Sequence, residues 1–371
     1  MATSARKSLT IGLIPADGIG REVLPAARTA LEAVGSDIPP LKFVDLLAGF
    51  ELFTRTGTAL PDETVESLQN ECDCALFGSV SSPSRKVAGY SSPIVGLRKK
   101  LDLYANIRPV LSVAPTPDEP AKVDMIVVRE NTECLVSRAI PNPATLIYTG
   151  FLSSSILSKK SKKSQKRAKK LGQRVSLQNM LHHESAAWHS NSPFNVLAKW
   201  HLTIIHKSNV LSVTDGLFRE SVRAVHAKEP KYQDISVAEQ LVDSAVYRLF
   251  REPEIYDVMV APNLYGDILS DAAAALVGSL GVVPSVNSGD NFVMGEPVHG
   301  SAPDIVGQNI ANPIASIRSA ALMLRHLGYA KGADRIDAAV DSVIREGTLL
   351  TPDLGGKSKT SEVVDAIVKR I

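Results

Sequence analysis

Short apolar segments alternate with amphipathic segments along this chain, and this alternation constrains its fold more than any other feature. The first apolar run, residues 9–15, leads through a glycine turn at 17–20 into a helical pattern over 21–31. Continuous apolar residues are typical of a strand buried on both faces, whereas apolar residues three and four apart indicate a helix. Strand, turn and helix in this order predict an α/β fold with a largely parallel sheet.

The same rhythm continues to the end of the chain. We expect further strands at residues 41–46, 74–78, 125–129, 202–206 and 256–261. We expect further helices at residues 61–68, 237–250, 267–277 and 312–327. Because 371 residues exceed one comfortable core, the chain suits two domains or one large α/β unit.

The composition excludes several classes of protein. No apolar run reaches the roughly 18 to 20 residues that a membrane helix needs, so we expect a soluble protein with no membrane partner. The cysteines Cys72, Cys74 and Cys134 are an odd number without CxxC spacing, which predicts neither a disulfide framework nor a zinc site.

Two carboxylates, Asp267 and Asp271, lie four residues apart on one predicted helix and therefore on one face of it. Oxygen ligands of this kind suit Mg²⁺ or Mn²⁺. The alternative is a pair of solvated acids, but the flanking residues are apolar. Asp243 is a third candidate ligand, with a hydrogen-bonded core acid as its alternative.

Four arginines, Arg85, Arg98, Arg108 and Arg129, precede or end predicted strands. Their guanidinium groups suit a small-molecule substrate with several carboxylates, although each alone is more typical of a surface ion pair. Lys207 follows the strand at 202–206 and would act as a general base if a cationic neighbour or desolvation lowered its pKa; otherwise it is a solvated lysine.

A turn of small residues at 299–304, with Asn312 further on, is of the kind that lets backbone amides approach a nucleotide. The carboxylate of Asp304 would accept hydrogen bonds from both ribose hydroxyls and repel a 2′-phosphate, which favours NAD. Taken alone, this run is equally compatible with an ordinary loop. The turn at 17–20 is a weak phosphate signal because it is not GxGxxG.

Six motifs in order make the chain similar to the isocitrate, isopropylmalate and homoisocitrate dehydrogenase family. They are PADGIGREV at 15–23, LRKKLDLYANIRP at 97–109, RENTE at 129–133, HKSNV at 206–210, NLYGDILSD at 263–271 and GSAPDI at 300–305.

This resemblance implies an isopropylmalate-dehydrogenase-like fold with two α/β domains, a central mixed sheet and an active site in the interdomain cleft. Residues 1–103 and 278–371 would form a large NAD-binding domain, and residues 104–277 a small substrate and dimer domain. A homodimer or higher homo-oligomer follows, because in the family Lys207 and Asp243 reach the site of the other subunit.

The resemblance also assigns roles to individual residues. The catalytic residues are Lys207 and Asp243. The substrate-binding residues are Arg85, Arg98, Arg108, Arg129 and Asn209. The metal ligands for Mg²⁺ or Mn²⁺ are Asp243, Asp267 and Asp271. The NAD-binding residues are His299, Gly300, Ser301, Ala302, Pro303, Asp304 and Asn312.

The loop at 81–93 decides which family member the chain is most similar to. Arg85 and several hydroxyls there suit a distal carboxylate, where an isopropylmalate enzyme would need an apolar contact. This implies NAD-dependent oxidative decarboxylation of homoisocitrate to 2-oxoadipate in lysine biosynthesis, with isocitrate or isopropylmalate as alternatives. The family location is mitochondrial, with a presequence absent or truncated here, and the cytoplasm is the alternative.

Residues 136–200 depart from the family pattern, and we expect them to be aberrant and disordered. Val136 stands where the family has an enol-protonating tyrosine, so we expect reduced turnover. A retained intron followed by a shifted reading frame is our hypothesis for this segment. It includes the basic run 159–174, whose alternative function is nucleic-acid binding, disfavoured by the lack of interleaved aromatic residues. An inactive assembly subunit is another alternative, but all the metal acids and arginines are retained.

Overall fold

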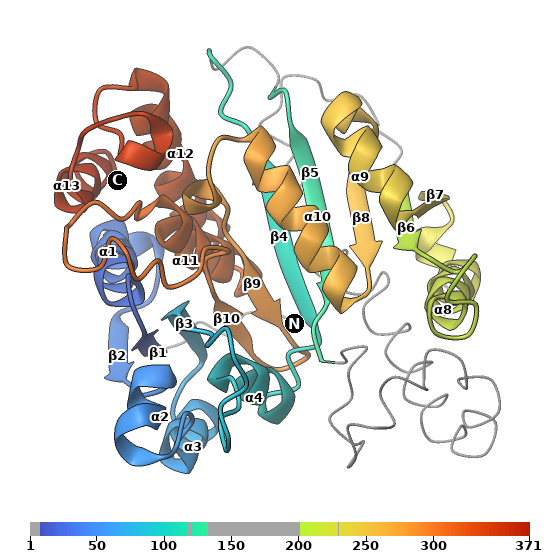
Figure 1. Ribbon diagram of the computed structural model, residues 1–371. Helices are drawn as coiled ribbons and strands as arrows, with labels where there is room; N and C mark the ends of the chain where they lie inside the picture. Colours follow the sequence, from blue (N-terminus) through green and yellow to red (C-terminus); the bar gives the residue numbers. More distant parts are fainter. Residues whose placement is uncertain (1–7, 117–120, 133–200, 229) are drawn as a thin grey trace.

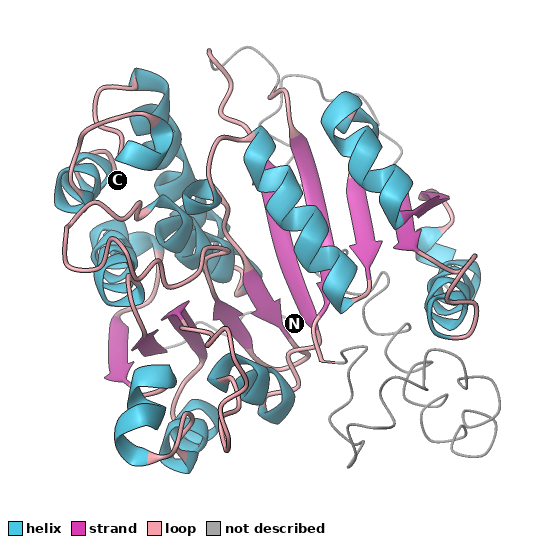
Figure 2. Cartoon of the chain, viewed as in Figure 1, coloured by secondary structure: helices cyan, strands magenta, loops and turns pink. Residues whose placement is uncertain are grey.

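The protein is described by a computed structural model, which defines residues 8–116, 121–132, 201–228 and 230–371. Within these residues a single sheet of ten strands runs through the molecule in the order β2-β1-β3-β10-β9-β4-β5-β8-β6-β7. Helices cover the sheet on its faces (Figure 2). The α/β class predicted from the alternating segments is confirmed, and the sheet is mixed, as the family resemblance implied, rather than largely parallel.

The strands and helices follow the expected alternation closely. The strands are β1 (Leu9–Ala16), β2 (Leu41–Asp45), β3 (Cys74–Ser79), β4 (Ala105–Leu111), β5 (Asp124–Glu130), β6 (His201–His206), β7 (Ser236–Leu241), β8 (Val258–Ala261), β9 (Val286–Ser288) and β10 (Val293–Gly295). The α-helices are α1 (Gly20–Val34), α2 (Phe50–Thr56), α3 (Asp62–Asn70), α4 (Pro93–Lys100), α8 (Thr214–Lys228), α9 (Val242–Arg251), α10 (Asn263–Leu276), α11 (Ile314–His326), α12 (Ala330–Glu346) and α13 (Thr360–Val368).

The sheet is parallel at both sides and antiparallel in the middle. β1 pairs in parallel with β2 and β3, and β6 pairs in parallel with β7 and β8. Between these regions β9 pairs antiparallel with both β10 and β4, and β4 pairs antiparallel with β5. Since β4 and β9 come from distant parts of the chain, their pairing brings residues 105–107 beside residues 286–288.

The two ends of the described chain share one hydrophobic core. Helix α1 contacts α11 and α13, so the blue and red elements lie side by side in Figure 1. Ile11, Leu31, Ile317 and Val340 are fully buried there. Burying one such side chain contributes about 1.5–3 kcal/mol, which favours docking of the C-terminal helices onto the N-terminal strands. The domain boundaries near residues 103 and 278 remain a proposal.

One predicted helix was wrong in its first part. Residues 237–250 were expected to be helical throughout, but residues 236–241 form β7 and the helix begins at Val242. Val237 and Leu241 are four apart, a spacing that places two side chains on one face of a strand as well as of a helix. Parallel pairing with β6, which local periodicity cannot report, decides for the strand.

Several expectations concern residues outside the described part of the chain. These are the basic run at 159–174, the departure from the family pattern at 136–200, Val136 and Cys134. In the described part, none of the helices combines the length and apolar character needed to cross a membrane.

Candidate functional site

Three elements bring two of the predicted arginines to the two predicted metal acids. Arg108 on β4 places Nη1 3.2 Å from Asp267 Oδ1 and 3.6 Å from Asp271 Oδ1, both on α10. Arg129 on β5 donates from Nη1 to the same oxygen of Asp267. β4 and β5 are neighbouring strands and α10 packs on both. The convergence of guanidinium groups and carboxylates predicted from the sequence is therefore present.

The arginines of this cluster are buried rather than on the surface. Arg98, Arg108 and Arg129 are 7%, 5% and 8% exposed. Burial lowers the pKa of Arg108, and burial together with the neighbouring Arg108 and Arg98 lowers the pKa of Arg129 to about 10. Arg129 therefore keeps its charge at neutral pH. Three buried cations at one place form a site that a polyanion would stabilise.

A chain of side-chain amides joins two of these arginines. Arg98 Nε donates to Asn287 Oδ1 at 3.1 Å, and Asn106 Nδ2 donates to the same oxygen at 3.1 Å. Arg108 Nε in turn donates to Asn106 Oδ1 at 2.5 Å. Both asparagines are fully buried. The two guanidinium groups are thus held in a fixed relative position by the groups behind them.

Glu296 supplies the counter-charge on the other side of this chain of amides. Its Oε2 accepts from Arg98 Nη2 at 3.0 Å and from Asn287 Nδ2 at 2.5 Å. Asn131 Nδ2 donates to Asn287 Oδ1 at 2.7 Å. Two buried atoms nearby, Arg129 Nε and Asn131 Oδ1, have no hydrogen-bond partner among the described residues. Unsatisfied buried groups at a binding site are ones that a ligand can satisfy.

The supporting polar residues Asn106, Asn287, Asn131 and Glu296 were missed from the sequence. One signal was available, because Asn106 lies two residues before Arg108 on the same strand and therefore on the same face. For Asn287 and Glu296 no local signal exists, since β9 meets β4 only through long-range pairing.

The acids that were expected to hold a metal are only partly assembled within one chain. The side chains of Asp267 and Asp271 are 44% and 54% exposed, so both remain open to a ligand. Burial and the charge of Asp267 raise the pKa of Asp271, a repulsion that a cation would relieve. Asp243 does not join them: among the described residues no group of three acidic, histidine or cysteine side chains could hold a metal.

Lys207 and Asp243 instead form an ion pair. Lys207 Nζ lies 2.6 Å from Asp243 Oδ1, and the bond from Lys207 lowers the pKa of Asp243. The buried carboxylate of Asp215 accepts from the backbone N–H of Lys207 at 2.7 Å. The condition stated for a general base, a cationic neighbour or a desolvated amine, is not met by this pair within one chain, because the side chain of Lys207 is 25% exposed beside a carboxylate. Asp243 is likewise 65% exposed and not a core acid.

Two predicted substrate residues lie outside the buried cluster. Arg85, in the loop between β3 and α4, is exposed, and no hydrogen bond or ion pair holds it among the described residues. Asn209, in the turn between β6 and α8, is exposed as well. Their predicted contact with substrate therefore stays a prediction.

The predicted nucleotide loop packs against the glycine turn at the start of α1. Ile19 N donates to Ser301 O at 3.0 Å, and a Cβ on Gly18 would come within 2.1 Å of that oxygen. Gly18 is therefore required by packing and by its φ of +57°. Burial lowers the pKa of His299, and its Nε2 is buried with no partner among the described residues. This unsatisfied nitrogen fits a loop that receives a ligand.

Asp304 and Asn312 differ in exposure and in hydrogen bonding. Asp304 is exposed on the loop after His299. Asn312 is buried; its Oδ1 accepts from Ile314 N at 3.0 Å at the start of α11, and its Nδ2 donates to Asp353 at 2.9 Å. The side chain of Asn312 therefore has a structural role, while the carboxylate of Asp304 remains free to accept bonds from a ligand.

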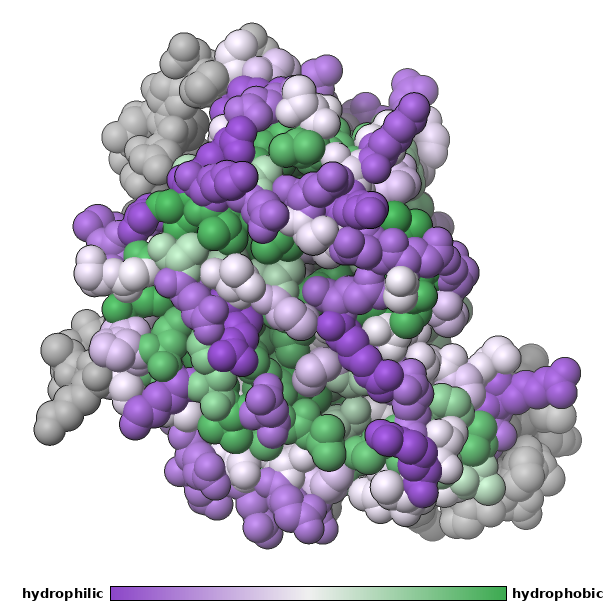
Figure 3. Space-filling model, turned by 90° about the vertical axis from the view of Figure 1, so that its left-hand side faces the viewer, coloured by the Kyte–Doolittle hydropathy of each residue, from purple (hydrophilic) through white to green (hydrophobic). Residues whose placement is uncertain are grey.

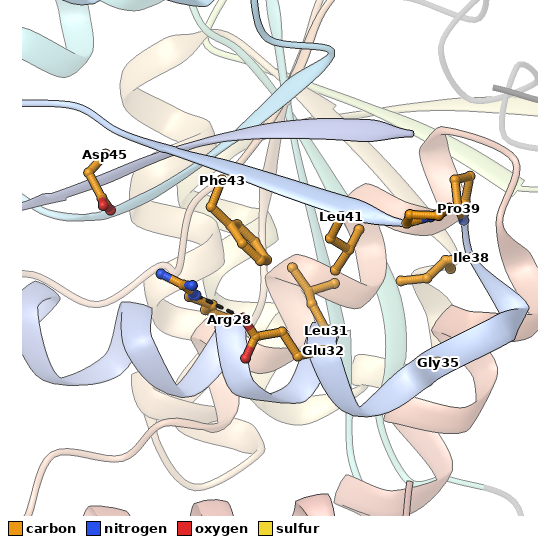
Figure 4. A pocket seen from close by; sticks show the side chains of 10 residues that line it. Arg28, Leu31, Glu32, Gly35, Ile38, Pro39, Leu41, Phe43 and Asp45 are labelled. Carbon is orange, nitrogen blue, oxygen red and sulfur yellow. Dashed lines mark hydrogen bonds and ion pairs between the residues drawn. The ribbon is translucent and has the colours of Figure 1, made fainter. Parts of the chain in front are cut away.

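A pocket of about 600 Å³ opens elsewhere, between α1 and β2 (Figure 4). Arg28 lies 4.5 Å from the ring centre of Phe43 and 3.0 Å from Glu32. None of the predicted site residues lines this pocket, and we therefore assign it no part in the function of the site.

Figure 3 shows the side of the molecule that lies at the left of Figure 1, where hydrophobic and hydrophilic side chains are interspersed.

Comparison with known proteins shows which family the chain is similar to. The family model described as isocitrate/isopropylmalate dehydrogenase matches residues 10–367. Isocitrate/homoisocitrate dehydrogenase of Thermus thermophilus is 43% identical over 361 residues, covering 97% of this chain and 98% of the relative. The 3-isopropylmalate/3-methylmalate dehydrogenase of Methanocaldococcus jannaschii is 40% identical over 367 residues, with coverages of 97% and 98%.

A solved structure gives the same result. Isocitrate dehydrogenase from Methylococcus capsulatus superposes with a TM-score of 0.77 at 31% identity, covering 98% of this chain and 99% of that one. The chain therefore belongs to the isocitrate/isopropylmalate dehydrogenase family, whose members are β-decarboxylating dehydrogenases.

Proposed function

We propose that this protein catalyses the NAD-dependent oxidative decarboxylation of homoisocitrate to 2-oxoadipate, with Mg²⁺ or Mn²⁺ as its metal. The observation that carries the proposal is the contact of buried Arg108 and Arg129 with the half-exposed acids Asp267 and Asp271. Guanidinium groups bind the carboxylates of a polyanion, and the two acids present oxygen ligands to a hard cation. A tricarboxylate chelating a cation needs both kinds of group at one place.

The residues of the chain divide the work as follows. Arg98, Arg108 and Arg129 orient the carboxylates, and Arg129 Nε, which has no partner among the described residues, is left to donate to a ligand. Asp267 and Asp271 would hold a divalent cation, which would supply a Lewis acid for the hydroxyl and the developing ketone, and the loop at 299–304 would hold NAD as the hydride acceptor. Lys207 would remove the hydroxyl proton in the site of a second subunit, where Asp243 would be a further ligand.

The substrate class follows from the loop at 81–93. Arg85 is exposed and unpaired within the described residues, and the same loop carries Ser81, Ser82 and Ser84 before it. A third carboxylate, as in homoisocitrate, would find a cation there, whereas the apolar side chain of isopropylmalate would find no matching surface. Isocitrate, whose third carboxylate lies closer to the reacting carbons, is the alternative, and isopropylmalate is a weaker one.

The coenzyme preference rests on Asp304. Its exposed carboxylate suits the two ribose hydroxyls of NAD and would repel the 2′-phosphate of NADP. We propose, on family resemblance alone, a mitochondrial place in lysine biosynthesis, with the cytoplasm as the alternative.

We also propose a homodimer formed through α9 and α10. These adjacent helices carry four exposed hydrophobic side chains, Tyr247 at 64%, Phe250 at 51%, Leu264 at 47% and Ile268 at 48%. Apolar residues gathered on one surface indicate a protein interface. A second copy placed there would cover them and bring its Lys207 and Asp243 toward α10, which completes the site.

The proposal is tested by measuring NADH formation with homoisocitrate, isocitrate and isopropylmalate in parallel, each with and without Mg²⁺. Turnover fastest with homoisocitrate and abolished by a chelator is the expected result.

Because Val136 replaces the family tyrosine, we expect the rate to rise when residues 136–200 are replaced by the segment of the Thermus relative. Equal rates in both proteins would contradict that part.

A further inference from the structure

The loop that joins β3 to α4, residues 80–92, is fastened at its first residues to the start of α2. Ser81 N donates to Asp17 Oδ2 at 3.0 Å, and Phe50 N donates to the same oxygen at 2.7 Å. The other oxygen of Asp17 accepts from Glu51 N at 3.0 Å. Asp17 is fully buried. A buried carboxylate that accepts three backbone bonds fixes the relative position of the loop entrance and α2.

The same loop is fastened a second time near its end. The ring of Tyr90 lies 4.9 Å from that of Phe50 at 80° and 5.2 Å from that of Phe53 at 63°, both on α2. Tyr90 Oη also donates to Ser81 O at 3.2 Å. Gly89 has a φ of +77°, which turns the chain just before Tyr90. The loop is thus closed on itself and held edge-to-face against α2.

Between the two fastenings the loop is exposed and carries Arg85 and Lys86. Arg85 has neither a hydrogen bond nor an ion pair in the described part of the chain. The loop leads directly into α4, whose Arg98 donates to the buried amide of Asn287. Figure 1 shows α2 and α4 at the same end of the molecule. The fastenings therefore act on the part of the loop that carries the free guanidinium group.

We propose that Tyr90 is a positioning residue for substrate selection: packed on Phe50 and Phe53, it holds the loop so that Arg85 meets the distal carboxylate. This inference rests on the proposed function, since it assigns Arg85 to that carboxylate. The physical reason is entropy. When a long side chain on a free loop binds a ligand, both the loop backbone and the side-chain rotamers lose conformational entropy. In a closed loop the backbone has already lost most of its conformational entropy before binding.

A purely structural role for Tyr90 makes a different prediction, and a double-mutant cycle separates the two. If Tyr90 acts through Arg85, the change Tyr90→Leu affects the substrate KM in the unmodified chain but hardly affects it once Arg85→Ala is present. If Tyr90 only stabilises the fold, the two effects add. Tyr90→Phe keeps the ring packing and loses the hydrogen bonds of the hydroxyl with Ser81 and Ser92. Lys86→Ala removes a neighbouring exposed cation and is the matched control for Arg85→Ala.

The experiment measures kcat and KM for homoisocitrate and NAD in these variants, with calorimetric binding of homoisocitrate and hydrogen exchange of residues 80–92. We expect Tyr90→Leu to raise the homoisocitrate KM about ten-fold and to leave kcat and the NAD KM within about two-fold. Tyr90→Phe should stay near the unmodified value, and hydrogen exchange of the loop should rise only in Tyr90→Leu.

Additive effects in the double mutant, or unchanged loop exchange in Tyr90→Leu, overturn the positioning role. Failure of the unmodified chain both to turn over and to bind homoisocitrate overturns the proposed function instead. In that case the exchange measurement still decides whether Tyr90 holds the loop, so the two failures are distinguishable.

Discussion

Lys207 Nζ lies 2.6 Å from Asp243 Oδ1, and this pair stands apart from the acids Asp267 and Asp271 of the same chain. If the pair completes the site of a second subunit, two different inactive chains should complement each other. Mixing Lys207→Ala with Asp271→Asn chains after joint refolding should restore roughly a quarter of the unmodified activity, because only mixed dimers contain one intact site.

The matched control is a second mixture, refolded in the same way. It combines a chain that carries both changes, Lys207→Ala and Asp271→Asn, with a chain that carries Lys207→Ala alone. It should show no recovery, since no combination then yields an intact site. Recovery absent from the first mixture as well would mean that Lys207 serves the site of its own chain.

Asn106 should control how well the arginines bind substrate. In Asn106→Leu, Arg108 Nε loses its acceptor and stays buried without a partner, which costs about 1–3 kcal/mol. We expect the substrate KM to rise about ten-fold or more, with the NAD KM unchanged. Steady-state kinetics with each substrate varied separately measures this. An unchanged substrate KM would show that the chain of amides does not position Arg108.

Coenzyme choice should depend on Asp304. The change Asp304→Asn removes the charge and keeps the shape, so the repulsion of a 2′-phosphate is relieved. We expect the ratio of kcat/KM for NAD over NADP to fall about ten-fold or more. Asp290→Asn, an exposed acid on the β9–β10 turn, is the control. A ratio that does not change would remove Asp304 from coenzyme recognition.

Stability should depend on pH through Asp37. Lys331 and Arg335 lower its pKa below the ordinary value of 3.8, so its contribution is complete above that value. The contribution is lost as the pH falls through the lowered pKa of the folded state. Asp37→Asn should therefore lower the melting temperature at about pH 7 and lower it less at about pH 3. Asp45→Asn, an exposed acid at the end of β2, is the control; an equal deficit at both pH values would contradict the assignment.

The parts of this molecule that could be predicted from sequence are those with a local pattern. Asp267 and Asp271 share a helix face because they are four apart. Arg108 and Arg129 meet because β4 pairs with β5, and of these two strands only β5 was expected from the sequence. The supporting atoms could not be predicted in this way. Asn287 and Glu296 contact Arg98 because β9 and β10, which follow Arg98 by almost 200 residues in the sequence, lie in the middle of the sheet.

The error at residues 237–241 has the same origin. The local spacing of Val237 and Leu241 is compatible with both a strand and a helix, and only the neighbouring strand β6 selects between them. The chemical environment of Lys207 could not be predicted from the sequence either. Its partner Asp243 lies in another element, so the charge beside the amine could not be predicted from the residues that flank it.

The most direct test of the whole account is the initial rate of NADH formation with homoisocitrate in the unmodified chain and in Asp271→Asn. Isopropylmalate at the same concentration serves as the comparison substrate. We predict Mg²⁺-dependent turnover that prefers homoisocitrate and falls at least about a hundred-fold in Asp271→Asn, since a lost metal ligand removes the stabilisation of the developing charge. Faster turnover of isopropylmalate, or an unaffected rate in Asp271→Asn, would contradict it.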